Sequence, residues 1–351
     1  MPPSIDPAIL RALSLDSAAK IATHGGSGFS STFRITTPTT SVFVKTSSSP
    51  GAATMFEGEH ASLNAIHDAV PSLCPKSFAW GQLDKGDGYF LATEFLDLGG
   101  GGIRGSSANP SKGSSGMSLA QKLARLHSTP APTPPGYDVP QFGFPVSTCC
   151  GDTPQNNEFS ASWADFFATK RLLAILERGE ANNGRDPDLR RTIERTVSEV
   201  VPKLLGDGHL GGKDGVRAVV VHGDLWSGNK SRGCFVGRGK PDEESMGTSG
   251  GGDEAGGGME DVVYDPAACY AHNEYDFGIM HMFGGFGAGF WKEYHAIVPK
   301  TEPESEYEDR VKLYESYHHL NHWSIFGGGY KSGAVGLLEG LLRKYGDRRG
   351  C

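Results

Sequence analysis

The sequence predicts an α+β protein with two lobes: a small N-terminal lobe with an antiparallel sheet and one key helix, and a larger, mainly helical C-terminal lobe. Three features lead to this prediction. Strand-like runs of β-branched and aromatic residues occur at 32–36, 41–45 and 89–96. Segments with helical spacing of apolar residues dominate the later part of the chain. Two valine-rich runs, at 219–221 and 262–263, end in polar residues, as buried strands do at the mouth of a cleft.

Length, charge and cysteine content narrow the class of protein. A chain of 351 residues can form one large domain or two lobes. Its formal net charge of −8 argues against a general nucleic-acid or anionic-membrane binder, and no apolar run is long enough to span a bilayer. The six cysteines lack Cys-x-x-Cys spacing, so we expect a reducing compartment. Asp6 and Asp16 argue against a transit peptide at the N-terminus, because transit peptides are poor in acidic residues. We therefore expect a soluble, cytoplasmic protein.

Glycine is the compositional outlier, with 50 residues, roughly twice the average frequency. Much of the excess lies in two tracts, at about 99–117 and 237–260. Such tracts bury too little apolar surface to offset the entropy lost on ordering, and we interpret both as flexible insertions in surface loops. The sequence therefore predicts an N-terminal lobe over residues 1–96 and a C-terminal lobe over residues 97–351, which carries both insertions.

The N-terminal lobe opens with a helix signal, because Asp6 can cap a helix that has Pro7 in its first turn. A glycine-rich turn precedes the first two strand-like runs. Its glycines are Gly25, Gly26 and Gly28. Glycines between strands let backbone N–H groups approach phosphate oxygens, although such a turn is more often a plain hairpin. Lys45 ends the second run, at a place where a lysine can pair with nucleotide phosphates. Its presence favours a phosphate-binding role for the glycine-rich turn.

A helix predicted over 54–67 supplies the partner that this lysine needs. Glu57 and Glu59 lie on it, and Glu59 is the favoured partner of Lys45, although two acidic residues on a helix often form only a solvated face. The apolar run at 89–96 then enters a short polar segment with the character of a hinge that binds adenine through its backbone. The predicted hinge residues are Glu94, Phe95 and Leu96.

The C-terminal lobe is predicted to be built on helices. They are expected at 119–127, 163–180, 188–205, 290–300, 307–323 and 337–345, with a further apolar helix after Asp276. His318, His319 and His322 lie within about one turn. A metal cluster is one interpretation, but no carboxylate stands at metal-ligand spacing, so a substrate-facing or buried hydrogen-bonded role is favoured.

The valine-rich runs carry the strongest chemical signal. Asp224 is followed five residues later by Asn229, the spacing of a kinase catalytic loop, in which the aspartate accepts the proton of the substrate hydroxyl and the asparagine holds magnesium. Asp265 follows the second run, where a second metal-binding carboxylate is needed. A His-Gly-Asp tripeptide alone is a weak signal, whereas the ordered set of Lys45, Asp224, Asn229 and Asp265 is strong.

Several further segments resemble the fructosamine kinase family, the ketosamine-3-kinases or protein-ribulosamine 3-kinases, which are related in fold to aminoglycoside phosphotransferases and protein kinases. The segments are MFEGEHASL at 55–63, QFGF at 141–144, TCCGDTPQNNEF at 148–159, HGDLWSGN at 222–229, YDPAACYAHNEYD at 264–276, MFGGF at 282–286, YHAIVPK at 294–300 and YHHLNHW at 317–323. They follow one another in family order over nearly the whole chain. The resemblance implies a bilobal protein-kinase-like fold with ATP between the lobes.

The resemblance also implies an activity and the residues that perform it. The activity is ATP-dependent phosphorylation of the 3-hydroxyl of a ketosamine, a sugar adduct of an amine or of a protein lysine, after which the phosphorylated adduct loses phosphate and releases the amine. By this resemblance Asp224 is the catalytic base, and Asn229 and Asp265 are the Mg2+ ligands. Phosphate contacts come from Gly25, Gly26, Gly28 and Lys45, and Glu59 orients Lys45. The hinge is formed by Glu94, Phe95 and Leu96, and the sugar contacts are Trp226 and His322.

Two alternatives stay open at the level of sequence. The first is a related phosphotransferase that acts on an aminoglycoside or a choline-like amino alcohol, which would not require Trp226 or His322. The second is a pseudokinase that works as a binding module, which would not need all four polar residues of the ordered set. The sequence also leaves open whether the protein is a monomer or a homodimer.

Two features depart from the family pattern. Phe29 stands where many family members carry a cysteine, so a disulfide between glycine-rich loops is not expected. A long insertion separates Asn229 from Asp265, which must meet at one metal. Because the entropy of loop closure grows slowly with length, this insertion is tolerable if it loops out into solvent.

Overall fold

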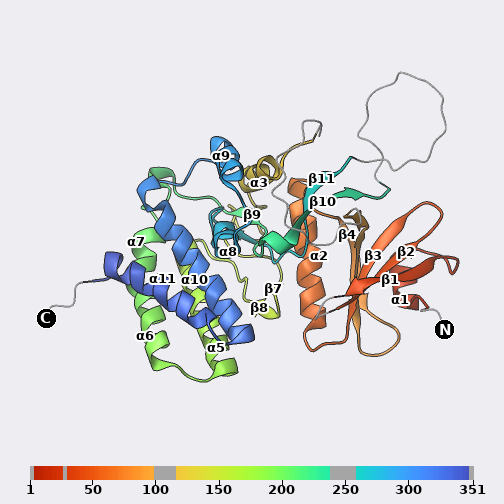
Figure 1. The fold of residues 1–351 in the computed structure, drawn as a ribbon, viewed down its shortest axis with the longest axis horizontal. Coiled ribbons are helices and arrows are strands. Elements are labelled where there is room, and N and C mark those ends of the chain that lie inside the picture. Colours follow the sequence, from red (N-terminus) through yellow and green to blue (C-terminus); the bar gives the residue numbers. More distant parts are fainter. Residues whose placement is uncertain (1–3, 27–29, 99–115, 238–257, 348–351) are drawn as a thin grey trace, which may run out of the picture.

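The structure, a computed structural model, has two lobes of different composition (Figure 1). It describes residues 4–26, 30–98, 116–237 and 258–347. A five-stranded antiparallel sheet dominates the N-terminal lobe, and helices dominate the C-terminal lobe. The predicted α+β architecture is therefore confirmed. Both glycine-rich tracts fall largely on residues outside the described ranges.

The N-terminal sheet has the strand order β1-β2-β3-β5-β4. Its strands are β1 (Lys20–Gly26), β2 (Ser31–Thr36), β3 (Ser41–Ser47), β4 (Ser77–Gln82) and β5 (Tyr89–Glu94). Ile35 pairs with Val42 across β2 and β3, and both are buried in a small apolar cluster with Phe90. The helix α1 (Pro7–Ala12) adds Ile9 to this cluster, and the Asp6 carboxylate caps it by accepting a hydrogen bond from the Ala8 N–H at 2.9 Å.

The helix α2 (Ala52–Ala69) connects the sheet to the C-terminal lobe (Figure 1). A Cβ atom on Gly58 would lie 2.6 Å from the carbonyl oxygen of Ser147, so only glycine allows this close approach to the segment that leads into the C-terminal lobe. The Ser62 hydroxyl accepts a hydrogen bond from the Ala268 N–H at 3.0 Å. Because these contacts hold α2 against the second lobe, its polar side chains have a defined position in the cleft.

The C-terminal lobe contains most of the helices. They are α3 (Leu119–Ser128), α4 (Trp163–Phe166), α5 (Ala174–Asn183), α6 (Pro187–Arg195), α7 (Val201–Leu205), α8 (Tyr275–Phe283), α9 (Ala288–Ile297), α10 (Tyr307–Phe326) and α11 (Tyr330–Tyr345). Wider π-helical turns at Phe167–Leu173 and Thr196–Val200 join α4 to α5 and α6 to α7. The long helices predicted at 163–180 and 188–205 are therefore present, each with one irregular segment that the apolar spacing does not reveal.

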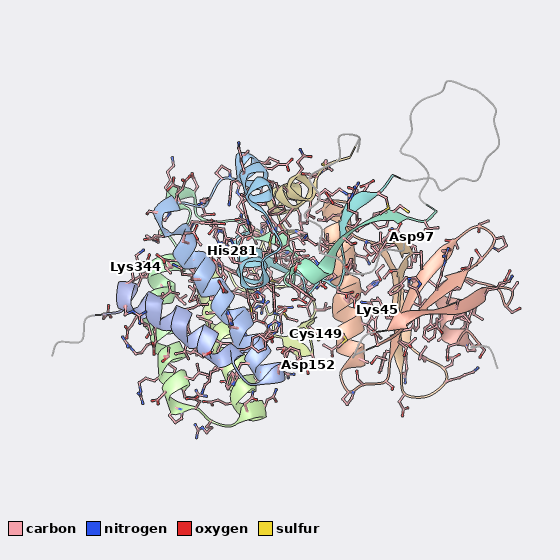
Figure 2. All side chains as sticks on the ribbon, in the orientation of Figure 1. Lys45, Asp97, Cys149, Asp152, His281 and Lys344 are labelled. Carbon is pink, nitrogen blue, oxygen red and sulfur yellow. The ribbon has the colours of Figure 1, made fainter. Side chains whose placement is uncertain are left out.

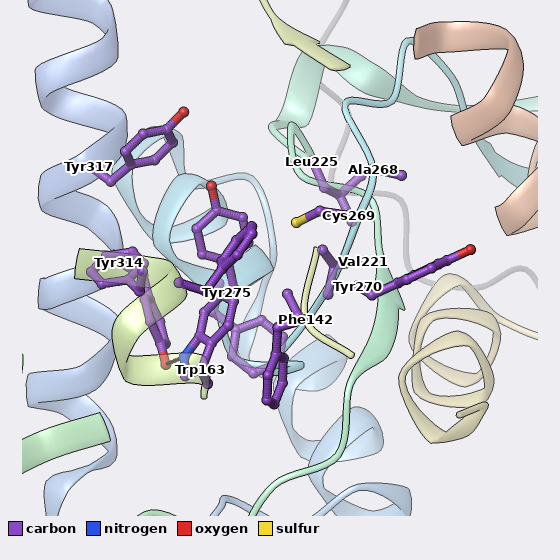
Figure 3. Packing of buried hydrophobic residues seen from close by; sticks show 14 of the residues in the cluster. Phe142, Trp163, Val221, Leu225, Ala268, Cys269, Tyr270, Tyr275, Tyr314 and Tyr317 are labelled. Atoms are coloured by element: carbon purple, nitrogen blue, oxygen red, sulfur yellow. Dashed lines mark hydrogen bonds between the residues drawn. The ribbon is translucent and has the colours of Figure 1, made fainter. Parts of the chain in front are cut away.

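Aromatic side chains fill the centre of this lobe (Figure 3). Trp163 is fully buried and donates its indole N–H to the Tyr314 hydroxyl at 2.9 Å. Tyr275 and Phe167 lie edge-on to the Tyr314 ring, with centroid distances of 5.8 and 5.2 Å. Edge-to-face pairs and burial both stabilise such a core, at about 0.5–1.5 kcal/mol per pair beyond area burial. This core supports α8 and α10, the two helices nearest the candidate site.

Short strands deliver the polar residues to the boundary between the lobes. They are β6 (Leu96–Asp97), β7 (Thr148–Cys150), β8 (Thr153–Gln155), β9 (Val219–Val221), β10 (Lys230–Phe235), β11 (Glu260–Val263) and β12 (Cys269–Ala271). β9 pairs with β12, and β10 lies between β11 and β6. The strand β10 was not predicted, because its residues include lysine, serine, arginine and glycine. We propose that the lobe boundary lies at β6, with residues 1–96 and 97–351 as the two lobes.

Two details of the helical region differ from the expected boundaries. The last helix begins at Tyr330 rather than near 337, because a lysine, a serine and a glycine in its first turn hide the apolar spacing. The helix α10 continues to Phe326, past the predicted end at 323, and stops at Gly327, whose φ is 66°. Among the described helices, none combines the length and apolarity that a membrane crossing needs.

Candidate active site

The strand β9 leads into the segment predicted as a catalytic loop, and Asp276 holds this segment in place. The backbone N–H groups of His222 and Gly223 donate to the two Asp276 carboxylate oxygens at 2.8 and 2.7 Å. The His127 imidazole lies 3.1 Å from the same carboxylate. Burial disfavours the charged form, but His127 and the hydrogen-bonded backbone outweigh it and keep the pKa of Asp276 below its ordinary value. Asp276, at the start of α8, therefore fixes the backbone that immediately precedes Asp224.

Gly223 has no space for a side chain at this point. Its φ is +79°, and a Cβ atom would lie 2.0 Å from the Ala267 carbonyl oxygen. We expect Gly223→Ala to reduce the free energy of unfolding by about 3 kcal/mol or more, through backbone strain and steric overlap, and to lower kcat. Gly86→Ala is the matched control, because Gly86 has φ +81° but no atom within 4 Å of its added Cβ. Urea unfolding should show a loss of only about 1 kcal/mol for the control; equal losses would contradict the steric argument.

Both carboxylate oxygens of Asp224 have neighbours. The Cys150 thiol lies 3.7 Å from Oδ1, and the Asn229 amide lies 3.3 Å from Oδ2. Burial, with a smaller contribution from the negative charge of Asp265, raises the pKa of Asp224 to about 8. An added positive charge at this point would lower that pKa and favour the carboxylate. A cation bound here and the charged form of Asp224 would therefore stabilise each other.

The strand pair β10–β11 brings Asn229 and Asp265 together. Lys230 pairs with Val263 in this ladder, and the Tyr264 N–H donates to the Asn229 carbonyl oxygen at 3.1 Å. The Asn229 amide lies 3.5 Å from the Asp265 carbonyl oxygen. Asp265 adopts φ 55°, which is uncommon outside glycine and typical of strained functional positions. The two residues meet despite the insertion, because β10 and β11 form the base of a hairpin whose distal part lies outside the described residues.

Lys45 joins the N-terminal sheet to this group. Its ammonium lies 2.6 Å from Glu59 on α2 and 2.6 Å from Asp265, and Figure 2 places it at the junction of the lobes. The side chains of Lys45 and Glu59 are only 14% and 12% exposed. Burial disfavours the ammonium, but Asp265 and Glu59 outweigh it and raise the pKa of Lys45, so the lysine stays charged. The ion pair predicted with Glu59 rather than Glu57 is present.

The glycine-rich turn is placed only in part. Gly25, with φ +97°, and Gly26 lie at the end of β1, and Gly26 pairs with Ser31 at the start of β2. The turn therefore joins two antiparallel strands, as the sequence indicates. Gly28 and Phe29 lie outside the described residues, and phosphate contact by this turn stays a prediction.

The predicted hinge lies at the end of β5 and in β6. The Phe95 ring is buried, with the Arg34 guanidinium 4.3 Å from its centroid. The Phe95 carbonyl oxygen accepts a hydrogen bond from the Val236 N–H at 3.0 Å, and Leu96 pairs with Phe235 of β10. Glu94 accepts a hydrogen bond from the Lys76 N–H. The Phe95 carbonyl is therefore occupied within the protein, and adenine contact by this segment stays a prediction.

Trp226 and His322 come together through a third ring. The centroid of Phe283, the last residue of α8, lies 5.6 Å from that of Trp226 and 5.1 Å from that of His322. His322 Nδ1 lies 2.8 Å from the His318 carbonyl oxygen. Burial lowers the pKa of His322, which favours a neutral ring that donates from Nδ1 and keeps Nε2 as an acceptor. The two predicted sugar contacts therefore form one wall beside the catalytic loop.

Sequence reasoning assigned no role to three residues that the structure brings to this site: Asp276, Cys150 and Phe283. A carboxylate at the start of an apolar helix is a detectable signal for Asp276, because it must be satisfied when that helix is buried. Cys150 and Phe283 have no comparable signal, since each reaches the site through packing across the lobe.

Asn229 and Asp265 are the residues that could hold a metal ion. Carboxylate and amide oxygens are the ligands that magnesium prefers, and two of them suffice where nucleotide phosphates and water supply the rest. The Asn229 amide nitrogen donates to Asp224, so its side-chain oxygen is the atom that would bind the metal. Within the ranges that the structure describes, no three His, Cys, Asp or Glu side chains form a metal-binding group.

Known proteins resemble this chain over most of its length. The sequence profile of the fructosamine kinase family matches residues 11–344. A chloroplastic protein-ribulosamine 3-kinase of Arabidopsis thaliana is 33% identical, over 92% of this chain and 83% of that protein. A ketosamine-3-kinase of Mus musculus is 31% identical, over 93% of this chain and 96% of that protein.

Solved structures share the fold. A candidate fructosamine-3-kinase of Thermobifida fusca superposes with a TM-score of 0.69 and 22% identity, covering 97% of this chain and 100% of that chain. An aminoglycoside phosphotransferase in a ternary complex with AMP-PNP and hygromycin B superposes with a TM-score of 0.54 and 12% identity, covering 97% and 98%. At these identities the likeness concerns the fold, which is bilobal and shared with phosphotransferases.

Proposed function

The chain belongs to the fructosamine kinase family, and on that premise we propose that it uses ATP and Mg2+ to phosphorylate the 3-hydroxyl of ketosamines. The observation that carries the proposal is the continuous set of contacts from Glu59 through Lys45 and Asp265 to Asn229 and Asp224. A phosphotransferase needs a cation, metal ligands and a base within one cleft, and this set supplies them. Ketosamines fit as the acceptor class because curated relatives with that activity align over nearly the whole chain.

Each residue has a task in the proposed reaction. Asp224 accepts the hydrogen bond of the 3-hydroxyl and takes its proton while the hydroxyl oxygen bonds to the γ-phosphorus. The bond between the γ-phosphorus and the bridging oxygen breaks, and ADP leaves with that oxygen. Because such a transfer is loose, positioning and charge neutralisation matter more than base strength. Lys45 neutralises phosphate charge, and Glu59 keeps the lysine directed into the cleft. Bound magnesium, held by Asn229 and Asp265, would neutralise charge on the phosphates and orient them.

The acceptor side of the proposal rests on the aromatic wall. Trp226 offers an apolar face to the sugar, and Nε2 of His322 can accept a hydrogen bond from a sugar hydroxyl. The product, a 3-phosphoketosamine, loses phosphate by elimination and releases the free amine, so the biological result would be deglycation. Both free adducts and glycated proteins are possible substrates within this class. Location in the cytoplasm stays a prediction from the sequence.

A direct assay tests the proposal. Purified protein is incubated with Mg-ATP and synthetic fructosamine or ribulosamine adducts, and the products are followed by mass spectrometry and phosphorus NMR. We expect a product heavier by one phosphoryl group, with the new phosphorus signal coupled to the C3 proton. No phosphorylated ketosamine at any enzyme concentration would refute the proposal. Phosphorylation of an aminoglycoside or choline in place of the ketosamine would favour the wider superfamily instead.

A further inference from the structure

Two further aromatic residues continue the wall beyond His322. Phe326 follows one helical turn later on α10, and Tyr330 begins α11. Their ring centroids lie 5.8 and 5.2 Å from that of His322 and 6.3 Å from each other. Trp226, Phe283, His322, Phe326 and Tyr330 therefore form one unbroken series of ring contacts, the aromatic strip, which starts two residues after Asp224.

Three of the five strip residues are exposed, and His322 and Tyr330 are half-buried. Trp226 and Phe283 are each 38% exposed, and Phe326 is 63% exposed. Large exposed apolar residues elsewhere in the described ranges, such as Phe78 on β4 and Ile297 on α9, lie on separate elements. A contiguous exposed apolar surface beside a catalytic group usually marks a binding surface, whereas isolated exposed apolar residues are ordinary. The strip therefore calls for a specific occupant.

The proposed chemistry limits that occupant. A ketosamine has two ends on either side of the reacting carbon: a chain of hydroxyl groups, and C1 with its amine substituent. The hydroxyl chain would lose hydrogen bonds to water against an apolar surface, which is unfavourable. A hydrocarbon group on the amine gains by the same burial. Trp226 and His322 are the predicted contacts of the sugar. Phe326 and Tyr330 lie beyond them in the strip and are therefore available to the other half of the substrate.

We propose that Phe326 and Tyr330 form a subsite for the amine half of the ketosamine, and that this subsite favours amines carrying an aromatic or large aliphatic group. The inference rests on the proposed function and specifies its substrate class. Two contacts fix the end of the strip that lies nearest Asp224. Trp226 lies directly over Gly228, where an added Cβ would be 2.1 Å from its ring, and His322 is tied to the His318 carbonyl oxygen. Rigid aromatic side chains bind with little loss of conformational entropy.

The test compares two adducts that differ in one group. Fructosyl-glycine and fructosyl-phenylalanine have the same sugar, amine and carboxylate and differ in a benzyl group. We expect wild-type protein to give a kcat/KM roughly tenfold higher for the phenylalanine adduct, in keeping with burial of one hydrophobic group. Phe326→Ser should reduce this ratio to between about one and about three. Phe326→Trp, which keeps a large aromatic ring, should retain the wild-type ratio. Phe78→Ser, which removes a 45% exposed phenylalanine far from the strip, should keep the wild-type ratio.

The outcomes separate this inference from the function on which it rests. Phosphorylation of both adducts with equal kcat/KM, or a ratio that Phe326→Ser leaves intact, would overturn the subsite and leave the kinase activity standing. Phosphorylation of neither adduct, nor of their ribulosyl counterparts, would overturn both. Sedimentation velocity provides the remaining comparison: a wild-type dimer that Phe326→Ser converts to a monomer would assign the strip to self-association and overturn the subsite. Because Phe326 is largely exposed, its variants should keep the wild-type melting temperature.

Discussion

Replacing Asp224 by asparagine should lower kcat by on the order of 10³-fold, the range expected for loss of a general base. Asparagine has nearly the same shape, but its amide cannot take the proton of the attacking hydroxyl. It would also turn an amide N–H₂ toward Cys150 or toward the amide of Asn229, both of which direct hydrogen-bond donors at the carboxylate. Both effects act on the acceptor side of the reaction.

Nucleotide binding should survive the Asp224→Asn substitution. Lys45, which is expected to contact the phosphates, donates its hydrogen bonds to Glu59 and Asp265. Asparagine at 224 nearly keeps the size of the side chain beside the expected metal ligand Asn229. Isothermal titration with ADP and magnesium should therefore give a Kd within about threefold of wild type, so the loss appears in kcat rather than in KM for ATP. Asp165→Asn is the matched control, since Asp165 is an exposed residue in the first turn of α4. Undiminished turnover by Asp224→Asn would remove Asp224 from its role.

The sequence is informative about this site because each half of it is local. Asp224 and Asn229 lie five residues apart after one buried strand, and Asp265 follows another, so motif spacing predicts them without knowledge of the fold. Lys45 and Glu59 are predictable as a pair because a strand and the following helix deliver them from the same lobe. The structure places all five within one series of contacts.

The remaining features depend on contacts between distant segments. The carboxylate of Asp276 reaches the backbone of His222 across 54 positions of sequence, and no local pattern specifies such a partner. The strand β10 closes the distance between Asn229 and Asp265, yet its lysine, arginine and glycine give it little strand propensity. Its pairing with β11 and β6 outweighs that propensity. Phe283 likewise joins Trp226 to His322 only because α8 and α10 pack together.

Two buried histidines should make the fold sensitive to mild acid. His318 and His272 are both almost fully buried. Burial lowers the pKa of His318 to about 3 and that of His272 to about 4, from an ordinary value of 6.5. Each ring is neutral in the folded state, so between pH 6.5 and these values the unfolded chain binds more protons than the folded chain. The contribution of these two histidines to stability therefore rises with pH through this window and is lost as pH falls below 6.5. Asp224 contributes in the opposite direction, because its pKa is raised to about 8 and the folded chain binds the extra proton there.

The neighbouring charges do not reverse this sign. Asp276 faces His318 and raises its pKa, but His322, Arg171 and His319 lower it further. Glu274 raises the pKa of His272, whereas Arg310 and His127 lower it. The carboxylates of Asp276 and Glu274 themselves have lowered pKa values, despite burial, through hydrogen bonds and nearby cationic groups. Their contribution to stability is lost only at more acidic pH than that of the histidines.

Between pH 8 and pH 5 each histidine should lower the free energy of unfolding by about 2 kcal/mol, or by about 4 kcal/mol together. Urea unfolding of wild type and of His318→Phe at several pH values between 5 and 8 measures the share of one histidine as the difference between their midpoints. His318→Phe should remove about half of the joint contribution, because a phenyl ring can keep the contacts with Tyr275 and Tyr317, whose centroids lie 5.7 and 5.1 Å from that of His318. A difference in midpoint between wild type and His318→Phe that stays constant from pH 8 to pH 5 would show that the buried ring of His318 binds a proton in the folded state, against the burial that the structure assigns to it.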